Sequence, residues 1–92
     1  MSAEPSIRTV VVTGQDGLAL DPCYAIAKTV ARRQARVTVQ RDTESADAGS
    51  LLALLCLGAT QGTKLVVSAS GPERAQVLEE LSDLFTSEIG ST

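Results

Sequence analysis

Two segments of this chain alternate apolar and polar residues, and this pattern restricts the possible folds more than any other feature. The alternation runs through "ARVTVQRD" at residues 35–42 and through "TKLVVSAS" at residues 63–70. It predicts strands that bury one face and leave the other in solvent. The inward side chains would be Val37, Val39, Leu65, Val67 and Ala69. The fold should therefore contain a sheet that is covered on one side only.

Two further strands are predicted from shorter signals. The segment "SIRTVVVTG" is rich in β-branched residues and closes at Gly14, which predicts a strand over residues 6–13. The segment "ESADA" follows a turn and predicts a short, weak strand with Ala46 and Ala48 directed inward.

The first helix is predicted from Pro22 to about Arg33. Asp21 is a suitable N-cap, and proline suits the first helical position because the N–H that it lacks would be unpaired there. Arg32 and Arg33 would form a solvated last turn, where positive charge favours the helix dipole. The buried face would hold Cys23, Ile26, Ala27 and Val30, with Tyr24 and Lys28 off that face.

Two more helices are expected. Ser50 would cap a helix from Leu51 to about Leu57 that ends at Gly58. Gly71 and Pro72 would open the last helix. Its core stripe would consist of Ala75, Leu78, Leu81, Leu84 and Phe85, and its polar face would carry Glu79, Glu80 and Asp83.

The element order is then β-α-β-β-α-β-α. Half-exposed strands and helices that are amphipathic on one side predict an α+β fold, an open-faced sandwich of a four-stranded antiparallel sheet with three helices on one face. The 92 residues would form a single domain with its core at about residues 6–88, a polar lead-in at 1–5 and a frayed end at 90–92.

Composition excludes several function classes. The net charge is −3, and the only aromatic residues are Tyr24 and Phe85, which argues against a nucleic-acid partner. No apolar run is long enough to cross a membrane and no signal peptide is recognisable, so we expect a cytoplasmic protein. Cys23 and Cys56 are expected to be reduced and mostly packed. Without any histidine they complete no common zinc set, so no metal or cofactor is expected.

Two stretches carry a resemblance to a known family. One is "GSLLALLCLGATQGTKLVVSASGP" at residues 49–72, and the other is the frame in which Gly17 and Leu18 precede Pro22. Over about residues 7–88 the chain resembles HPr, the histidine-containing phosphocarrier of the bacterial phosphoenolpyruvate-dependent sugar phosphotransferase system. The resemblance implies the same open-faced sandwich and a protein that is not itself an enzyme.

The frame lacks the two chemically active residues of that family. There it reads Gly-Leu/Ile-His-x-Arg-Pro-Ala, and the histidine carries the phosphoryl group. Here Ala19 stands at the histidine position and Asp21 at the arginine position. A methyl group cannot be phosphorylated, and a carboxylate repels phosphate where a guanidinium would neutralise it.

The resemblance also implies two other sites. Ser50 corresponds to the serine that a dedicated kinase phosphorylates in HPr of many Gram-positive bacteria, which makes it a regulatory phosphorylation candidate. In the family an apolar patch at the second helix and active loop binds enzyme I and other partners. Here that patch would consist of Leu20, Tyr24, Leu51, Leu52 and Leu55, with Lys28 the clearest remaining basic residue near it.

Three functional hypotheses follow. The first is a divergent HPr-like protein that carries no phosphoryl group at residue 19 and acts by docking to other proteins, phosphotransferase components or a transcriptional regulator. The second is a phosphoryl-transfer component that uses Ser50, Asp21 or Cys23 instead. The third is a protein that shares only the fold and serves as a small-molecule-sensing or assembly domain unrelated to sugar transport, because a fold does not by itself determine function.

Overall fold

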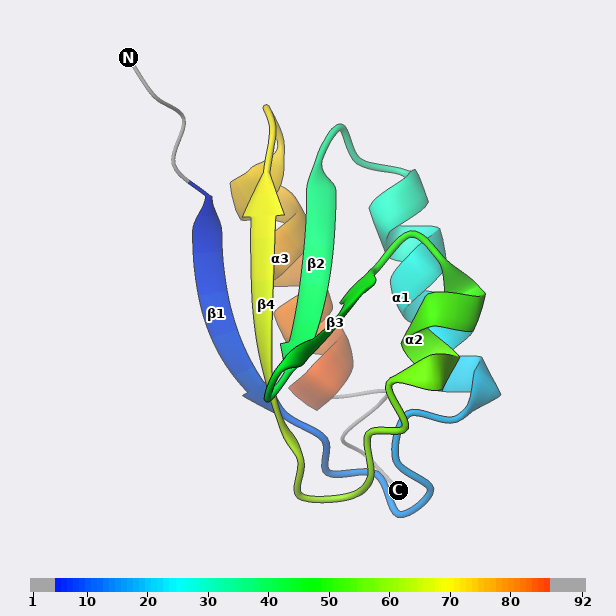
Figure 1. Ribbon diagram of the computed structural model, residues 1–92. Helices are drawn as coiled ribbons and strands as arrows, with labels where there is room; N and C mark the ends of the chain where they lie inside the picture. Colours follow the sequence, from blue (N-terminus) through cyan, green and yellow to red (C-terminus); the bar gives the residue numbers. More distant parts are fainter. Residues whose placement is uncertain (1–4, 87–92) are drawn as a thin grey trace.

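The computed structural model describes residues 5–86, which form four strands and three helices (Figure 1). In chain order these are β1 (Ser6–Val11), α1 (Leu20–Ala31), β2 (Arg36–Arg41), β3 (Glu44–Asp47), α2 (Leu51–Cys56), β4 (Lys64–Ser70) and α3 (Arg74–Thr86). The predicted frayed end at 90–92, and the lead-in apart from Pro5, lie outside the described residues.

The strands form one sheet in the order β1-β4-β2-β3, and every neighbouring pair is antiparallel. β4 lies in the interior, where Leu65 pairs with Val10 of β1 and Val67 pairs with Val39 of β2. The helices pack on one face of this sheet and leave the other face open (Figure 1). The predicted open-faced α+β sandwich is confirmed.

The core is aliphatic apart from Phe85, and the strand residues that the alternation directed inward belong to it. The five inward strand residues and both alanines of "ESADA" are buried, and Leu54, Ile26 and Val12 are fully enclosed. Phe85 is 3% exposed whereas Tyr24 is 57% exposed, so a single aromatic ring contributes to the core. Burial of these aliphatic side chains supplies most of the stabilisation of such a domain.

Three boundaries of β1 and α1 differ from the predictions. β1 ends at Val11 rather than at residue 13, because Val12 binds the turn before β4: its N–H donates to the carbonyl oxygen of Thr63 and its own carbonyl accepts from Gly62. α1 begins at Leu20 rather than Pro22 and ends at Ala31 rather than Arg33.

The predicted stripe of α3 is wrong at Ala75, which is exposed, and Leu84 is only half-buried. Val77, which the pattern missed, is fully buried together with Leu81. The reason is angular: at 100° per residue the buried set is centred between Val77 and Phe85, and Ala75 lies off that face.

Arg33 is not the solvated residue that was expected. Its Nε donates to Glu80 Oε1 at 3.0 Å, its Nη2 donates to Glu80 Oε2, and its Nη1 lies 3.4 Å from Glu73 Oε2. Glu73 also accepts from the backbone N–H of Gln34 at 2.7 Å. These bonds tie the turn after α1 to the first half of α3.

Within residues 5–86, no helix combines the length and the apolar character that crossing a membrane would require.

Candidate functional site

The loop between β1 and α1 is held in place by the loop that precedes β4. Leu18 N–H donates to the carbonyl oxygen of Ala59 at 2.9 Å, and Gln61 Nε2 donates to the carbonyl oxygen of Thr13 at 3.1 Å. Gly17 has a φ of +67°, and a Cβ on it would lie 2.4 Å from the Ala59 oxygen. Glycine is therefore required there both by backbone conformation and by space.

α1 begins one residue after Ala19. Ala19 has the extended backbone of an N-cap (φ −79°, ψ −172°), and its carbonyl accepts from Cys23 N–H at 3.1 Å, but no side chain caps the helix. The predicted N-cap role of Asp21 is wrong, because Asp21 is the second helical residue. The helix starts two residues after the Leu18–Ala59 bond, and Pro22 is tolerated in its first turn because an N–H there has no helical partner.

The electrostatics of this helix end are acidic. The exposed carboxylate of Asp21 lies in the first turn of α1, and the basic residue of the helix, Lys28, lies in the last turn. They lie seven positions apart, which is about 10 Å along the helix axis. A phosphate at Ala19 would meet a carboxylate close by and the Lys28 ammonium only at a distance.

The two thiols differ. Cys23 is fully buried, its Sγ donates a long 3.5 Å hydrogen bond to the carbonyl oxygen of Leu18, and burial raises the pKa of its thiol. Cys56 is exposed, so the expectation that both thiols are mostly packed is wrong for it. Cys56 lies four residues after Leu52 on the outer face of α2, whereas Leu54 faces the core.

Ser50 caps α2 as predicted. Its backbone is extended (φ −110°, ψ 112°), and its Oγ accepts from Ala53 N–H at 3.3 Å while the residue stays half-exposed. The nearby carboxylate of Asp47 accepts from Gly49 N–H at 2.9 Å.

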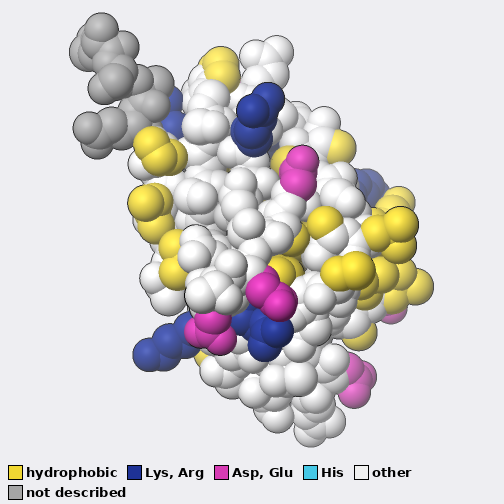
Figure 2. Space-filling model, in the orientation of Figure 1, with side chains coloured by type: hydrophobic (Ala, Val, Ile, Leu, Met, Phe, Trp, Pro, Cys, Tyr) yellow, Lys and Arg dark blue, Asp and Glu magenta, His cyan; other side chains and the backbone are white. Residues whose placement is uncertain are grey.

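Apolar side chains gather where α1 and α2 pack against each other. Leu20 and Tyr24 lie four residues apart on one face of α1 and are 56% and 57% exposed, and Leu52 of α2 is 74% exposed. Leu51 and Leu55 are half-buried against the core. Figure 2 shows a concentration of hydrophobic side chains on the side of the molecule where Figure 1 places α2 and α1. We call Leu20, Tyr24, Leu51, Leu52 and Leu55 the leucine patch.

Comparison with known proteins identifies the family. A family model described as "PTS HPr component phosphorylation site" matches residues 7–87. The chain belongs to the HPr family. The HPr phosphocarrier protein of Vibrio cholerae is 34% identical over 78 residues, which cover 85% of this chain and 92% of that protein. The phosphocarrier protein NPr of Escherichia coli is 30% identical over 81 residues, 87% of this chain and 90% of NPr.

The HPr fold is also shared by solved structures. HPr-C-His from Thermoanaerobacter tengcongensis matches with a TM-score of 0.88 at 24% identity, over 95% of this chain and 98% of that one. The present chain, although a member of the HPr family, contains no histidine among its 92 residues. Among the residues that the structure describes, no group of three or more Cys, Asp or Glu side chains is arranged to hold a metal ion.

The sequence could not identify two features of this site. The Gly17–Ala59 contact joins residues that are distant in the chain. The glycine at position 17 was the one feature of the local sequence that could have indicated it. The exposure of Cys56 follows from how α2 lies on the core, which its apolar sequence "LLALLC" did not indicate.

Proposed function

We propose that this HPr-family protein carries no phosphoryl group at residue 19 and acts as a regulatory or docking protein of the phosphotransferase system. The observation that carries the proposal is Ala19 at the N-cap of α1, directly followed by exposed apolar and acidic side chains in the first turn. The protein would bind partners without catalysing a reaction.

The chemistry of phosphoryl transfer supports this proposal. A phosphohistidine site needs a nucleophilic imidazole, N–H groups that receive the phosphate and a nearby cation. At the first turn of α1 only N–H groups of a helix end are available. Ala19 offers a methyl group, and Asp21 adds a negative charge that opposes an incoming phosphate.

The leucine patch supports a docking role. Leu20 and Tyr24 are exposed on α1 and Leu52 on the adjacent α2, and large exposed apolar side chains that cluster are typical of interaction sites. α2 carries no charged residue in its first or last turn, so the contact that it offers is apolar. Its partners would be phosphotransferase components or a transcriptional regulator. Their binding should depend only weakly on salt, because little charge steering is available.

Phosphorylation of Ser50 is the alternative with a supporting observation. Its Oγ lies at the surface of α2, and a phosphate at a helix N-terminus is electrostatically favourable. The carboxylate of Asp47 three residues earlier works against it. Of the other two alternative acceptors, Asp21 is exposed, whereas the Cys23 thiol is enclosed and out of reach of a partner.

The deciding experiment follows the intact mass of the protein. It is incubated first with phosphoenolpyruvate and enzyme I, and then with ATP and an HPr kinase. No gain in the first incubation is expected. A gain of one phosphate there would overturn the proposal. A gain of one phosphate only in the second incubation, absent in Ser50→Ala, would show that the protein is a regulator phosphorylated by a kinase at Ser50.

Docking is then tested by binding to enzyme I and other phosphotransferase proteins. Leu52→Asp should abolish binding, because it places a charge on the most exposed leucine of the leucine patch while leaving the core intact. Thr43→Asp adds the same charge to the exposed β2–β3 turn and should bind like the natural protein. Equal binding by both variants would exclude the leucine patch as the docking surface.

A further inference from the structure

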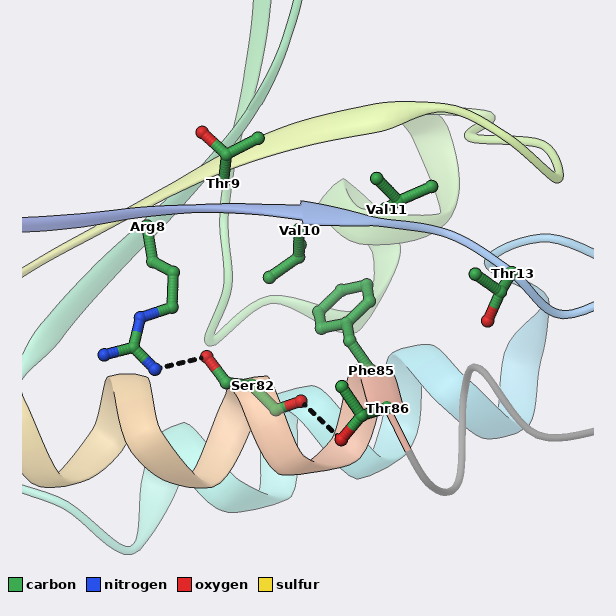
Figure 3. Close-up of a pocket in the computed structure, with 8 residues that line it drawn as sticks. All are labelled: Arg8, Thr9, Val10, Val11, Thr13, Ser82, Phe85 and Thr86. Atoms are coloured by element: carbon green, nitrogen blue, oxygen red, sulfur yellow. Dashed lines mark hydrogen bonds between the residues drawn. The ribbon is translucent and has the colours of Figure 1, made fainter.

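A groove lies between the edge strand β1 and the C-terminal half of α3, away from the leucine patch. It has a volume of about 530 Å³ and is lined by Arg8, Thr9, Val10, Val11, Thr13, Ser82, Phe85 and Thr86. Figure 3 shows Arg8 and Val10 directed from β1 toward α3, whereas Thr9 and Val11 point away from it. Arg8 and Val10 therefore line the groove one after the other along β1.

The two ends of the groove differ in chemistry. Val10 faces Phe85, which makes one end apolar, and Arg8 occupies the other end, where its Nη1 donates to Ser82 Oγ at 2.8 Å. None of the lining residues is acidic. The salt bridges within residues 5–86 involve Arg33 and Arg41, so Arg8 has no carboxylate partner among the described residues.

β1 also presents, beside this groove, backbone groups that pair with no other described strand. Within the described sheet β1 pairs with β4 alone, and the N–H and carbonyl of Val12 both bond toward the β4 side. Because the direction of the backbone N–H and carbonyl groups alternates along an antiparallel strand, those of Val10 and Arg8 point toward β4, as those of Val12 do. The N–H and carbonyl groups of Ile7, Thr9 and Val11 then point to the open edge.

We propose that β1 binds an extended peptide by strand addition, with an apolar side chain over Val10 and Phe85 and an acidic side chain two residues later opposite Arg8. In an antiparallel strand, residues two apart share a face and main-chain bonds form at the residues between them. The partner segment therefore reads apolar-x-acidic from its N-terminus, with the middle residue opposite Thr9. Charge complementarity to Arg8 sets its direction and register.

A second copy of β1 fits this groove less well. Antiparallel pairing of two β1 strands about Thr9 places Arg8 of one copy opposite Val10 of the other. A guanidinium would then lie over the apolar end, and no carboxylate would meet either Arg8.

The test is an amide NMR titration of the full chain with acetyl-Thr-Leu-Thr-Glu-Thr-amide at millimolar concentration. Shifts should concentrate at Ile7, Thr9 and Val11. A peptide with Lys in place of Glu should bind about fivefold more weakly, as expected for reversing one exposed charge pair. Equal response to both peptides, or shifts confined to Leu20, Tyr24 and Leu52, would overturn the proposal.

Reversing the charge at residue 8 distinguishes a loss of peptide recognition from a general loss of structure. Arg8→Glu should reverse the preference, so that it favours the Lys peptide, whereas Arg36→Glu on the interior strand β2 should leave it unchanged. If Arg8→Glu does not fold, Arg8→Gln should bind both peptides equally. Broadening of β1 signals with protein concentration alone would indicate pairing between copies and would contradict a peptide partner.

Discussion

The N–H of Leu18 donates to the carbonyl oxygen of Ala59 at 2.9 Å, and this bond joins the loop before α1 to the loop before β4. The contact leaves no room for a side chain at Gly17. α1 starts two residues after this bond, at Leu20 with Ala19 as its N-cap, and packs against α2.

Gly17→Ala should destabilise the protein by about 3 kcal/mol, the sum of a left-handed backbone strain and a clash with the Ala59 oxygen. Urea unfolding measures this. Gly58→Ala is the matched control, since Gly58 has a similar φ of +63° but no atom within 4 Å of the added Cβ. It should cost only about 1 kcal/mol. Equal losses in the two variants would mean that the loop contact contributes nothing beyond backbone strain.

Leu52→Asp should change the free energy of unfolding by less than about 0.5 kcal/mol, because Leu52 is 74% exposed and a carboxylate in a first helical turn is favourable. Leu54→Ala should cost about 3 kcal/mol, because Leu54 is fully buried. Thermal or urea unfolding compares the two. A large loss in Leu52→Asp would show that the side chain is needed for the core rather than for a surface contact.

The Arg33–Glu80 pair should make stability depend on acid pH. Hydrogen bonds from Arg33 hold the pKa of Glu80 below its usual value. A carboxyl group with a lowered folded-state pKa stabilises the fold above its unfolded pKa of about 4.3, and this contribution disappears as the pH falls through the folded-state pKa. Both side chains are partly exposed, so solvent screens the pair and its contribution to the free energy of unfolding is small.

Unfolding measured between pH 6 and pH 2.5 should therefore show a smaller acid-induced loss in Glu80→Gln than in the natural protein. Glu79→Gln is the control, because Glu79 lies on the same helix in solvent, without an ion pair to a described residue. Identical pH curves for Glu80→Gln and the natural protein would contradict the role given to the pair.

Cys56 should react with a thiol reagent in the folded protein, and Cys23 only on unfolding. Cys56 is exposed, whereas Cys23 is enclosed and burial raises the pKa of its thiol, which lowers the fraction of reactive thiolate. Colorimetric titration should count one fast thiol, and none in Cys56→Ser. A second fast thiol in the native state would exclude the buried placement of Cys23.

Restoring the two family residues should restore phosphoryl transfer if the scaffold is otherwise intact. The double variant Ala19→His with Asp21→Arg should gain one phosphate from phosphoenolpyruvate and enzyme I, at least about tenfold faster than Ala19→His alone, because the arginine neutralises the phosphate charge. Intact mass over time measures both rates. Failure of the double variant, with its fold preserved, would show that enzyme I does not dock on this surface.

The local sequence determined most of the fold. Alternation at Val37, Val39, Leu65 and Val67 assigned the buried sheet face, and Ser50 marked the start of α2, because strand alternation and helix capping depend on near neighbours in the chain. That Ala19 and Asp21 stand where the HPr family has its histidine and arginine is a prediction that rests on the sequence resemblance.

Only the tertiary structure showed the contacts between segments that are distant in the chain. Asp21 looked like an N-cap beside Pro22, yet the N-cap of α1 is Ala19, which directly follows the residue that bonds to Ala59. Arg33 looked like a solvated helix end, yet it binds Glu80, 47 residues away. These contacts depend on how the helices sit against the sheet, a relation between elements that no local pattern contains.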